Sequence, residues 1–159
     1  MRTAADLPEP IRDLIVAGRD AWRERDYPRA EDLLGRALAE AQRTRSAFGE
    51  SAALHFLGNV AFNRCHDTEA RRLHLAALSI SRAEGDDQGI ASSLGSLALI
   101  DAAEGDRPLA ATRFDEAFAA YERAMMPEAA ESLRRTARAL SGGTPLDRIV
   151  HRQSDGRRC

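Results

Sequence analysis

The chain has 159 residues, a formal net charge of −2 and 43% hydrophobic residues, a composition typical of one soluble globular domain. Its arginines are interleaved with acidic residues, which argues against nucleic-acid binding, and no apolar run approaches the roughly 20 residues of a membrane helix. The N-terminus shows no signal-peptide pattern, and the two cysteines, Cys65 and Cys159, suggest no disulfide framework. We therefore expect a cytoplasmic protein.

The predicted elements are helices that alternate with short polar turns. The first helix begins near Leu7 and carries apolar residues at helical spacing as far as Trp22. Asp26 is placed to cap the second helix and Asp67 to cap the fourth, because a carboxylate accepts hydrogen bonds from the first free backbone N–H groups. Gly85 lies in a polar stretch that predicts the end of the fourth helix.

The pattern is periodic, with a 40-residue repeat. Alanines at positions 30, 70 and 110 occupy matching places in the second, fourth and sixth predicted helices. A seventh helix is predicted from Pro127, where Leu133 matches Leu94 at a spacing of 39, which implies a loop that is one residue shorter. The sequence therefore predicts a helical repeat domain over residues 1–141 and a flexible tail over 142–159, with repeats at about 11–46, 50–86 and 90–125 and a cap at 127–141.

These residues resemble the tetratricopeptide repeat (TPR), in which small residues let the two helices of a hairpin approach closely. The matching small residues are Gly18, Ala30, Ala37, Gly58, Ala70, Ala77, Ala98, Ala110 and Ala117. The 40-residue period is similar to that of kinesin light chains, spindle-orientation adaptors and the sensor arms of bacterial transcriptional activators. The resemblance implies an all-α fold: an α-solenoid of three TPR-like hairpins plus a C-terminal capping helix, seven helices in all. His74 and Asp101 depart from the pattern.

In that family the first helix of each hairpin lines a concave groove, so the resemblance also implies a set of partner-binding residues. Arginines suit carboxylates, asparagines pair with peptide backbone, and Trp22 and Phe62 supply apolar anchors. The predicted partner is therefore a protein or peptide segment with acidic residues. The alternative is that these side chains are solvated and Trp22 packs against the second helix. The predicted groove residues are Arg12, Arg19, Trp22, Arg23, His55, Asn59, Phe62, Asn63, Arg134 and Arg138.

No catalytic or metal-binding signature is present. Cys65, His66, His55 and His74 lack the spacing of metal ligands, and the chain has no phosphate-binding loop or nucleophile motif. We expect no enzyme activity, no metal and no cofactor. Asp101 is expected to be partly buried and paired with an arginine of the next hairpin, because an unpaired buried carboxylate is costly.

The sequence thus favours an adaptor that binds a partner segment in a groove, as scaffold proteins do. One alternative is a regulatory or sensor protein that controls a transcriptional or signalling partner. Another is an enzyme whose active site carries no recognisable motif. Self-association through the exposed end faces of the array, giving a homodimer, is a further alternative.

Overall fold

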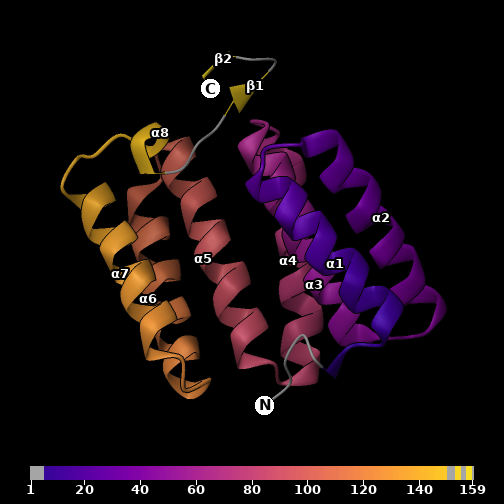
Figure 1. Ribbon diagram of the computed structural model, residues 1–159. Helices are drawn as coiled ribbons and strands as arrows, with labels where there is room; N and C mark the ends of the chain where they lie inside the picture. The colour runs from indigo at the N-terminus through magenta and orange to yellow at the C-terminus, as the bar shows by residue number, and fades with distance from the viewer. Residues whose placement is uncertain (1–5, 150–152, 155–156, 159) are drawn as a thin grey trace.

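The computed structural model describes residues 6–149, 153–154 and 157–158 (Figure 1). Seven long helices follow one another in antiparallel pairs, and the pairs lie side by side in chain order. A one-turn helix and two short strands follow them. The helices are α1 (Glu9–Arg23), α2 (Tyr27–Arg43), α3 (Ala47–Asn63), α4 (Asp67–Glu84), α5 (Asp87–Glu104), α6 (Arg107–Arg123), α7 (Pro127–Ser141) and α8 (Leu146–Ile149), and the strands are β1 (Gln153–Ser154) and β2 (Arg157–Arg158).

Several helices begin at a residue whose side chain accepts a backbone hydrogen bond. Asp26 caps α2 and Asp106 caps α6, each through a contact with the backbone N–H three residues further on, and Ser46 caps α3 in the same way. The prediction for Asp26 is confirmed. The prediction for Asp67 is wrong, because Asp67 is already the first residue of α4 and His66 is the N-cap residue.

Every connection between two of the long helices contains one residue in the left-handed backbone region, and these residues recur every 20 positions. The connections therefore share one geometry, which returns the chain antiparallel after each helix. Two of the six residues are glycines, which adopt this conformation without steric cost. The residues are Arg25, Arg45, Cys65, Gly85, Gly105 and Met125.

The 40-residue period holds to the start of α7. The helices α2, α4 and α6 begin at positions 27, 67 and 107, and α3, α5 and α7 begin at positions 47, 87 and 127. The shorter connection predicted before α7 is therefore not seen. Leu133 nevertheless packs against the apolar cluster that contains Leu94, so the side chain matched at a spacing of 39 faces the same core.

The small residues lie where two helices touch, as predicted. A methyl group built on Gly18 would approach within 2.6 Å of the Leu34 side chain, and one on Gly58 would approach within 2.7 Å of the His74 ring. Ala98 is fully buried. Larger residues at these positions would force the paired helices apart.

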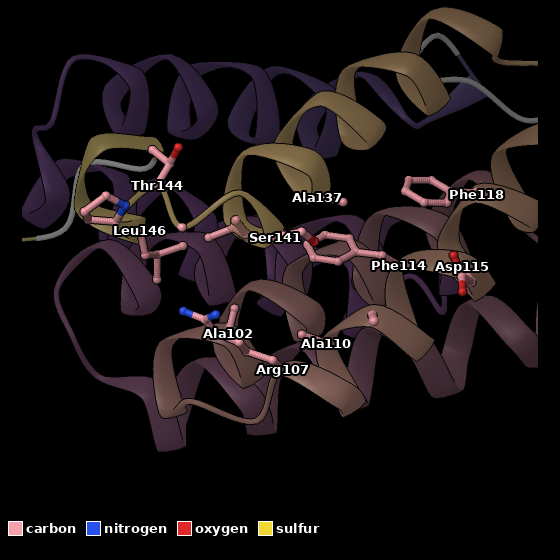
Figure 2. A pocket seen from close by; sticks show the side chains of 14 residues that line it. Ala102, Arg107, Ala110, Phe114, Asp115, Phe118, Ala137, Ser141, Thr144 and Leu146 are labelled. Carbon is pink, nitrogen blue, oxygen red and sulfur yellow. The ribbon is translucent and has the colours of Figure 1, made fainter.

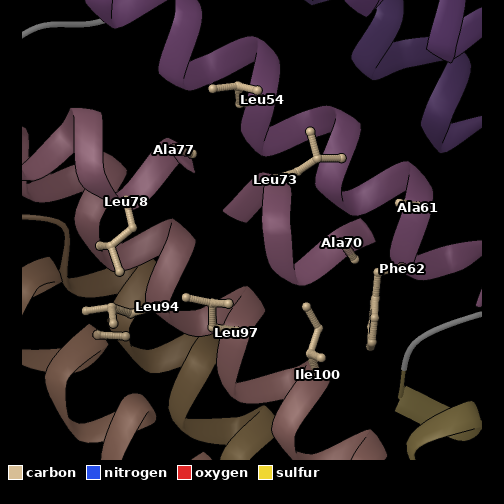
Figure 3. Packing of buried hydrophobic residues seen from close by; sticks show 11 residues of the cluster. Leu54, Ala61, Phe62, Ala70, Leu73, Ala77, Leu78, Leu94, Leu97 and Ile100 are labelled. Carbon is tan, nitrogen blue, oxygen red and sulfur yellow. The ribbon is translucent and has the colours of Figure 1, made fainter. Parts of the chain in front are cut away.

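The largest apolar cluster lies among α3, α4 and α5 (Figure 3). Leu97 and Ile100 of α5 are fully buried there and pack with Leu73 and Leu78 of α4. Phe62 of α3 belongs to the same cluster and is only 6% exposed. Burial of such side chains, at about 1.5–3 kcal/mol each, is the main force that holds the hairpins together.

Asp101 is a buried carboxylate at the centre of an ion-pair network. Its side chain is 1% exposed, and it accepts hydrogen bonds from Arg71 of α4, at 2.9 Å, and from Arg113 of α6. Arg71 also donates to Glu104 at 2.7 Å. The expected burial and arginine pairing are confirmed, but the arginines come from the preceding hairpin and from the same hairpin rather than from the next one.

The segment predicted as a flexible tail contains regular structure in its described part. One-turn helix α8 packs beside α7, and β1 pairs antiparallel with β2. These two-residue strands lie outside the long helices and are an exception to the predicted all-α fold. Within the described residues, no helix is long and apolar enough to cross a membrane. Cys65 is disulfide-bonded, contrary to expectation, and Cys159 lies outside the described residues.

Candidate functional site

The helices α1, α3 and α5 form one face of the molecule, here called the odd-helix face. Two side-chain hydrogen bonds connect neighbouring hairpins across it. Trp22 Nε1 of α1 donates to Asn63 Oδ1 of α3 at 2.7 Å, and Ser96 Oγ of α5 donates to Asn59 Oδ1 of α3 at 3.4 Å. These bonds hold the three helices in fixed relative positions, and two hollows lie between them.

The first hollow, here called the Trp22 hollow, lies where α1 and α3 end. It has a volume of about 290 Å³. Five of the predicted groove residues meet in it, and three further residues complete it. Its lining residues are Trp22, Arg23, Arg25, Tyr27, Asn59, Phe62, Asn63 and Leu99.

The Trp22 hollow combines an apolar floor with a cationic rim. Phe62 is almost completely buried and Leu99 is partly buried, so both contribute apolar surface, whereas Arg23 and Arg25 are exposed. Burial raises the pKa of the Tyr27 phenol, although the nearby Arg25 guanidinium opposes that rise. The phenol is therefore neutral at physiological pH, and the charge at the rim is positive. This arrangement suits a group that carries an acidic and an apolar part.

The two predicted asparagines are engaged within the protein. Asn63 accepts the bond from Trp22, and Asn59 lies 3.2 Å from His55 through its amide nitrogen while its oxygen accepts from Ser96. Their first role is thus to connect α1, α3 and α5. The structure differs here from the expectation of amides presented to a peptide backbone, because periodicity does not reveal bonds between side chains of neighbouring hairpins.

The second hollow, here called the His55 hollow, lies between the N-terminal half of α5 and the middle of α1 and α3. Its volume is about 230 Å³, and it contains two predicted residues, Arg19 and His55. Arg19 is engaged by the carboxylate of Asp20, at 3.1 Å. The other lining residues are Leu7, Ile15, Val16, Phe48, Ser51, Ala52, Phe56, Asp86, Gln88, Gly89, Ser92 and Ser93.

The rings of His55, which is partly buried, and His74, which is fully buried, form an edge-to-face imidazole pair. Their ring centroids are 5.3 Å apart, and the Nδ1 atom of each is buried without a hydrogen-bond partner among the described residues. Burial lowers the pKa of His55 to about 4, and burial together with the neighbouring His55 lowers the pKa of His74 well below its ordinary value. Both rings are therefore neutral at pH 7. The hydrogen bond expected for His74 is not seen at Nδ1.

Three predicted arginines line neither hollow. Arg12 contacts the adjacent Asp13, and Arg138 lies 3.9 Å from Glu131 on its own helix. Arg134 donates to Glu122 of α6 at 2.7 Å, and its guanidinium lies over the Phe118 ring. Arg134 and Arg138 were assigned to the groove from the 39-residue register. The contacts with Glu122 and Phe118 direct Arg134 toward α6, and the predicted second cluster of groove arginines lies outside both hollows.

Three residues of the Trp22 hollow are absent from the predicted partner-binding set, although the TPR pattern also directs Leu99 into the groove. Arg25 and Tyr27 flank the Asp26 cap, and Leu99 lies one repeat away from Asn59. Arg25 could have been identified from the sequence. It lies in the turn that follows the first helix, close to Arg23, the last predicted groove residue of that helix. Among the described residues, no group of three or more His, Cys, Asp and Glu side chains is placed to hold a metal ion.

No family model, no curated protein and no solved structure matches this chain. The functional argument therefore rests on the geometry of the odd-helix face.

Proposed function

We propose that the protein is a TPR-like helical-repeat adaptor that binds a segment of a partner protein at the Trp22 hollow. The observation that supports this proposal most directly is the meeting of Trp22, Arg23 and Phe62 in one hollow with a second arginine, Arg25. Aromatic and arginine side chains around an apolar floor are typical of interaction hot spots. The hairpins would act as a rigid α-solenoid that holds this surface.

In the proposed complex, an apolar side chain of the partner packs against Phe62 and Leu99, while a neighbouring carboxylate pairs with Arg23 or Arg25. Arg25 has no side-chain hydrogen bond or ion pair with the described residues, whereas Arg23 lies 3.8 Å from Asp20. Arg25 is therefore the stronger candidate for the partner's carboxylate. Because the arginines lie at an exposed rim, the contact is expected to weaken as salt rises.

An adaptor needs no catalytic group, and we propose that the protein is not an enzyme. We also propose the cytoplasm as its compartment, where Cys65 is expected to be reduced. Alkylation and mass spectrometry of the protein taken from its native cells would test the compartment through the oxidation state of Cys65.

The binding proposal can be tested with a displayed library of random dodecapeptides. The wild-type protein is expected to select peptides with an acidic residue next to an aromatic or aliphatic one. Selected peptides are then synthesised and titrated while tryptophan emission is followed, because Trp22 is the only tryptophan in the chain and lines the hollow. Saturable binding with a change in emission is the expected result.

The charge of the rim is tested with a matched pair of variants. Arg23→Glu with Arg25→Glu reverses the rim and should weaken the selected peptides by roughly tenfold or more, since charge-assisted hydrogen bonds are lost. Arg29→Glu with Arg45→Glu makes the same charge change at exposed positions outside the hollow and should leave affinity within about twofold. Equal affinities for the two double variants, or selected peptides without acidic residues, would contradict the proposal.

A further inference from the structure

A third cavity lies between α6 and α7, away from the odd-helix hollows, and is here called the α6–α7 pocket. It has a volume of about 450 Å³, within the range of small-molecule sites. Figure 2 shows the Phe114 ring in its middle, between α6 and α7. The lining residues are Ala102, Arg107, Ala110, Ala111, Phe114, Asp115, Phe118, Ala137, Leu140, Ser141, Gly143, Thr144, Pro145 and Leu146.

The pocket exists because α7 carries a small side chain where α3 and α5, which also stack on a preceding hairpin, carry a large one. Leu97 of α5 is fully buried against α4, and Leu57 lies at the same repeat position of α3. The corresponding residue of α7, one repeat after Leu97, is Ala137, which lines the pocket. Removing three carbon atoms at this contact leaves space that the one-turn helix α8 covers only partly, through Leu146.

The two ends of the pocket carry opposite charges. Arg107 and Asp115 are eight residues apart on α6, about 12 Å along the helix axis. Figure 2 shows the nitrogen atoms of Arg107 on the side of Leu146 and the Asp115 carboxylate at the opposite end, beside Phe118. Neither side chain forms an ion pair or a side-chain hydrogen bond with the described residues. The Arg107 end also holds Ser141 and Thr144, whose side chains are hydrogen-bond donors.

We infer that the α6–α7 pocket binds a small amphiphilic carboxylate. The carboxylate pairs with Arg107 at the end that holds Ser141 and Thr144, and the apolar body lies over Phe114 and Ala137. The negative charge of Asp115 at the far end sets the orientation, because it repels a carboxylate placed there. This inference is independent of the proposed adaptor function, since the residues of the two sites do not overlap.

The test is calorimetric titration of the full chain with three probes of one chain length: octanoate, octanol and octylamine. Octanoate is expected to bind saturably to one site, and octanol about tenfold more weakly or worse, because it lacks the charge that pairs with Arg107. Octylamine should bind more weakly than octanoate as well. Equal binding of all three probes, or no saturable binding of octanoate, would overturn the inference.

Two variants locate the site, each with a matched control. Arg107→Gln should weaken octanoate by roughly tenfold and leave octanol unchanged, whereas Arg29→Gln, the same change on exposed α2, should alter neither. Ala137→Leu restores the side chain found at position 97 and should abolish binding of octanoate and octanol alike. Its control is Ala119→Leu, an exposed position of α6 outside the pocket, which should bind as the wild type does.

The same variants distinguish the other occupants of this apolar surface. A second copy of the chain seated there would give a concentration-dependent mass in sedimentation that Ala137→Leu removes, with no octanoate binding by the wild type. Unchanged octanoate affinity in both Arg107→Gln and Ala137→Leu would place the carboxylate elsewhere. Either result would overturn the inference.

Discussion

The three interfaces between successive hairpins are built at the same positions but differ in how well they are filled. In the first, α2 packs on α3, and in the second, α4 packs on α5. Both have a leucine, Leu57 or Leu97, at the repeat position that Ala137 occupies in the third, where α6 packs on α7. The third interface contains the α6–α7 pocket.

The interfaces also differ in an ion pair that recurs with its charges reversed. Glu31 of α2 accepts from Arg64 at 2.7 Å, and one repeat later Arg71 of α4 donates to Glu104, also at 2.7 Å. At the third interface these positions are alanine and threonine, and both residues line the pocket. We therefore expect the first two interfaces to contribute more to the stability of the fold than the third, which has a smaller side chain and no ion pair at these positions.

The largest difference is expected at Asp101, which the second interface buries between two arginines. Asp101→Ala leaves Arg71 and Arg113 without their shared carboxylate and should lower the free energy of unfolding by about 3 kcal/mol. Ser141→Ala, at the equivalent exposed position of the third interface, should change it by less than about 0.5 kcal/mol. Urea denaturation measures both values, and a loss below about 1 kcal/mol for Asp101→Ala would show that the network adds little.

A decrease in pH should destabilise the second hairpin more than the third. At the positions of His55 and His74, the third hairpin has Gly95 and Phe114. The unfolded chain binds protons on these histidines below about pH 6.5, but the folded pKa of His55 is about 4. With respect to these two histidines, the free energy of unfolding is therefore highest well above pH 6.5, and it decreases as the pH falls toward 4. For His55 alone the loss between pH 7 and pH 5 is about 2 kcal/mol.

Urea denaturation at pH 7, 6 and 5 tests this, because carboxylates with ordinary pKa values stay mostly ionised over that range. His74→Phe, which introduces the residue found in the third hairpin, should reduce the slope of unfolding free energy against pH by about half. A slope equal to that of the wild type would mean that His74 is not held neutral.

The third interface should gain stability if its missing side chain is restored. Ala137→Leu fills part of the α6–α7 pocket and is expected to stabilise the fold by about 1 kcal/mol. Thermal unfolding monitored by circular dichroism measures the change. A decrease in melting temperature would show instead that the pocket walls are rigid and that leucine overpacks them.

The smallest effect is expected for the two ion pairs with reversed charges, Glu31–Arg64 and Arg71–Glu104, which are partly exposed. Glu31→Arg and Arg64→Glu should each cost about 0.5 kcal/mol, because each places like charges together. The double variant reproduces the order of charges found at the second interface and should recover most of that loss, as a double-mutant cycle in urea would reveal. Strictly additive losses would show that the pair is not coupled.

The helices and their order could be predicted because small and apolar residues recur at helical spacing, as at Gly18, Gly58 and Ala98. The turns could be predicted only at Gly85, and at 104–106, where glycine marks the left-handed residue. Arg25, Arg45, Cys65 and Met125 adopt the same conformation against their intrinsic preference. Packing of the flanking helices imposes that conformation, and local sequence does not record it.

The candidate site could be predicted in part. Trp22, Arg23 and Phe62 do meet in one hollow, since residues on one helix face stay together whatever their partners are. The internal use of Asn59 and Asn63 could not be predicted, because it depends on contacts between hairpins. The α6–α7 pocket could not be predicted either, because it depends on how closely α7 packs against α6.

The reversed charges of these ion pairs also disfavour stacking of the hairpins in an order other than that of the sequence. If two copies exchanged hairpins so that α2 stacked on α5, Glu31 would face Glu104, and if α4 stacked on α3, Arg71 would face Arg64. Either arrangement opposes like charges and is disfavoured. The same repulsion would follow a genetic deletion of one repeat unit. The alternation of charge therefore favours a single order of hairpins in the stack.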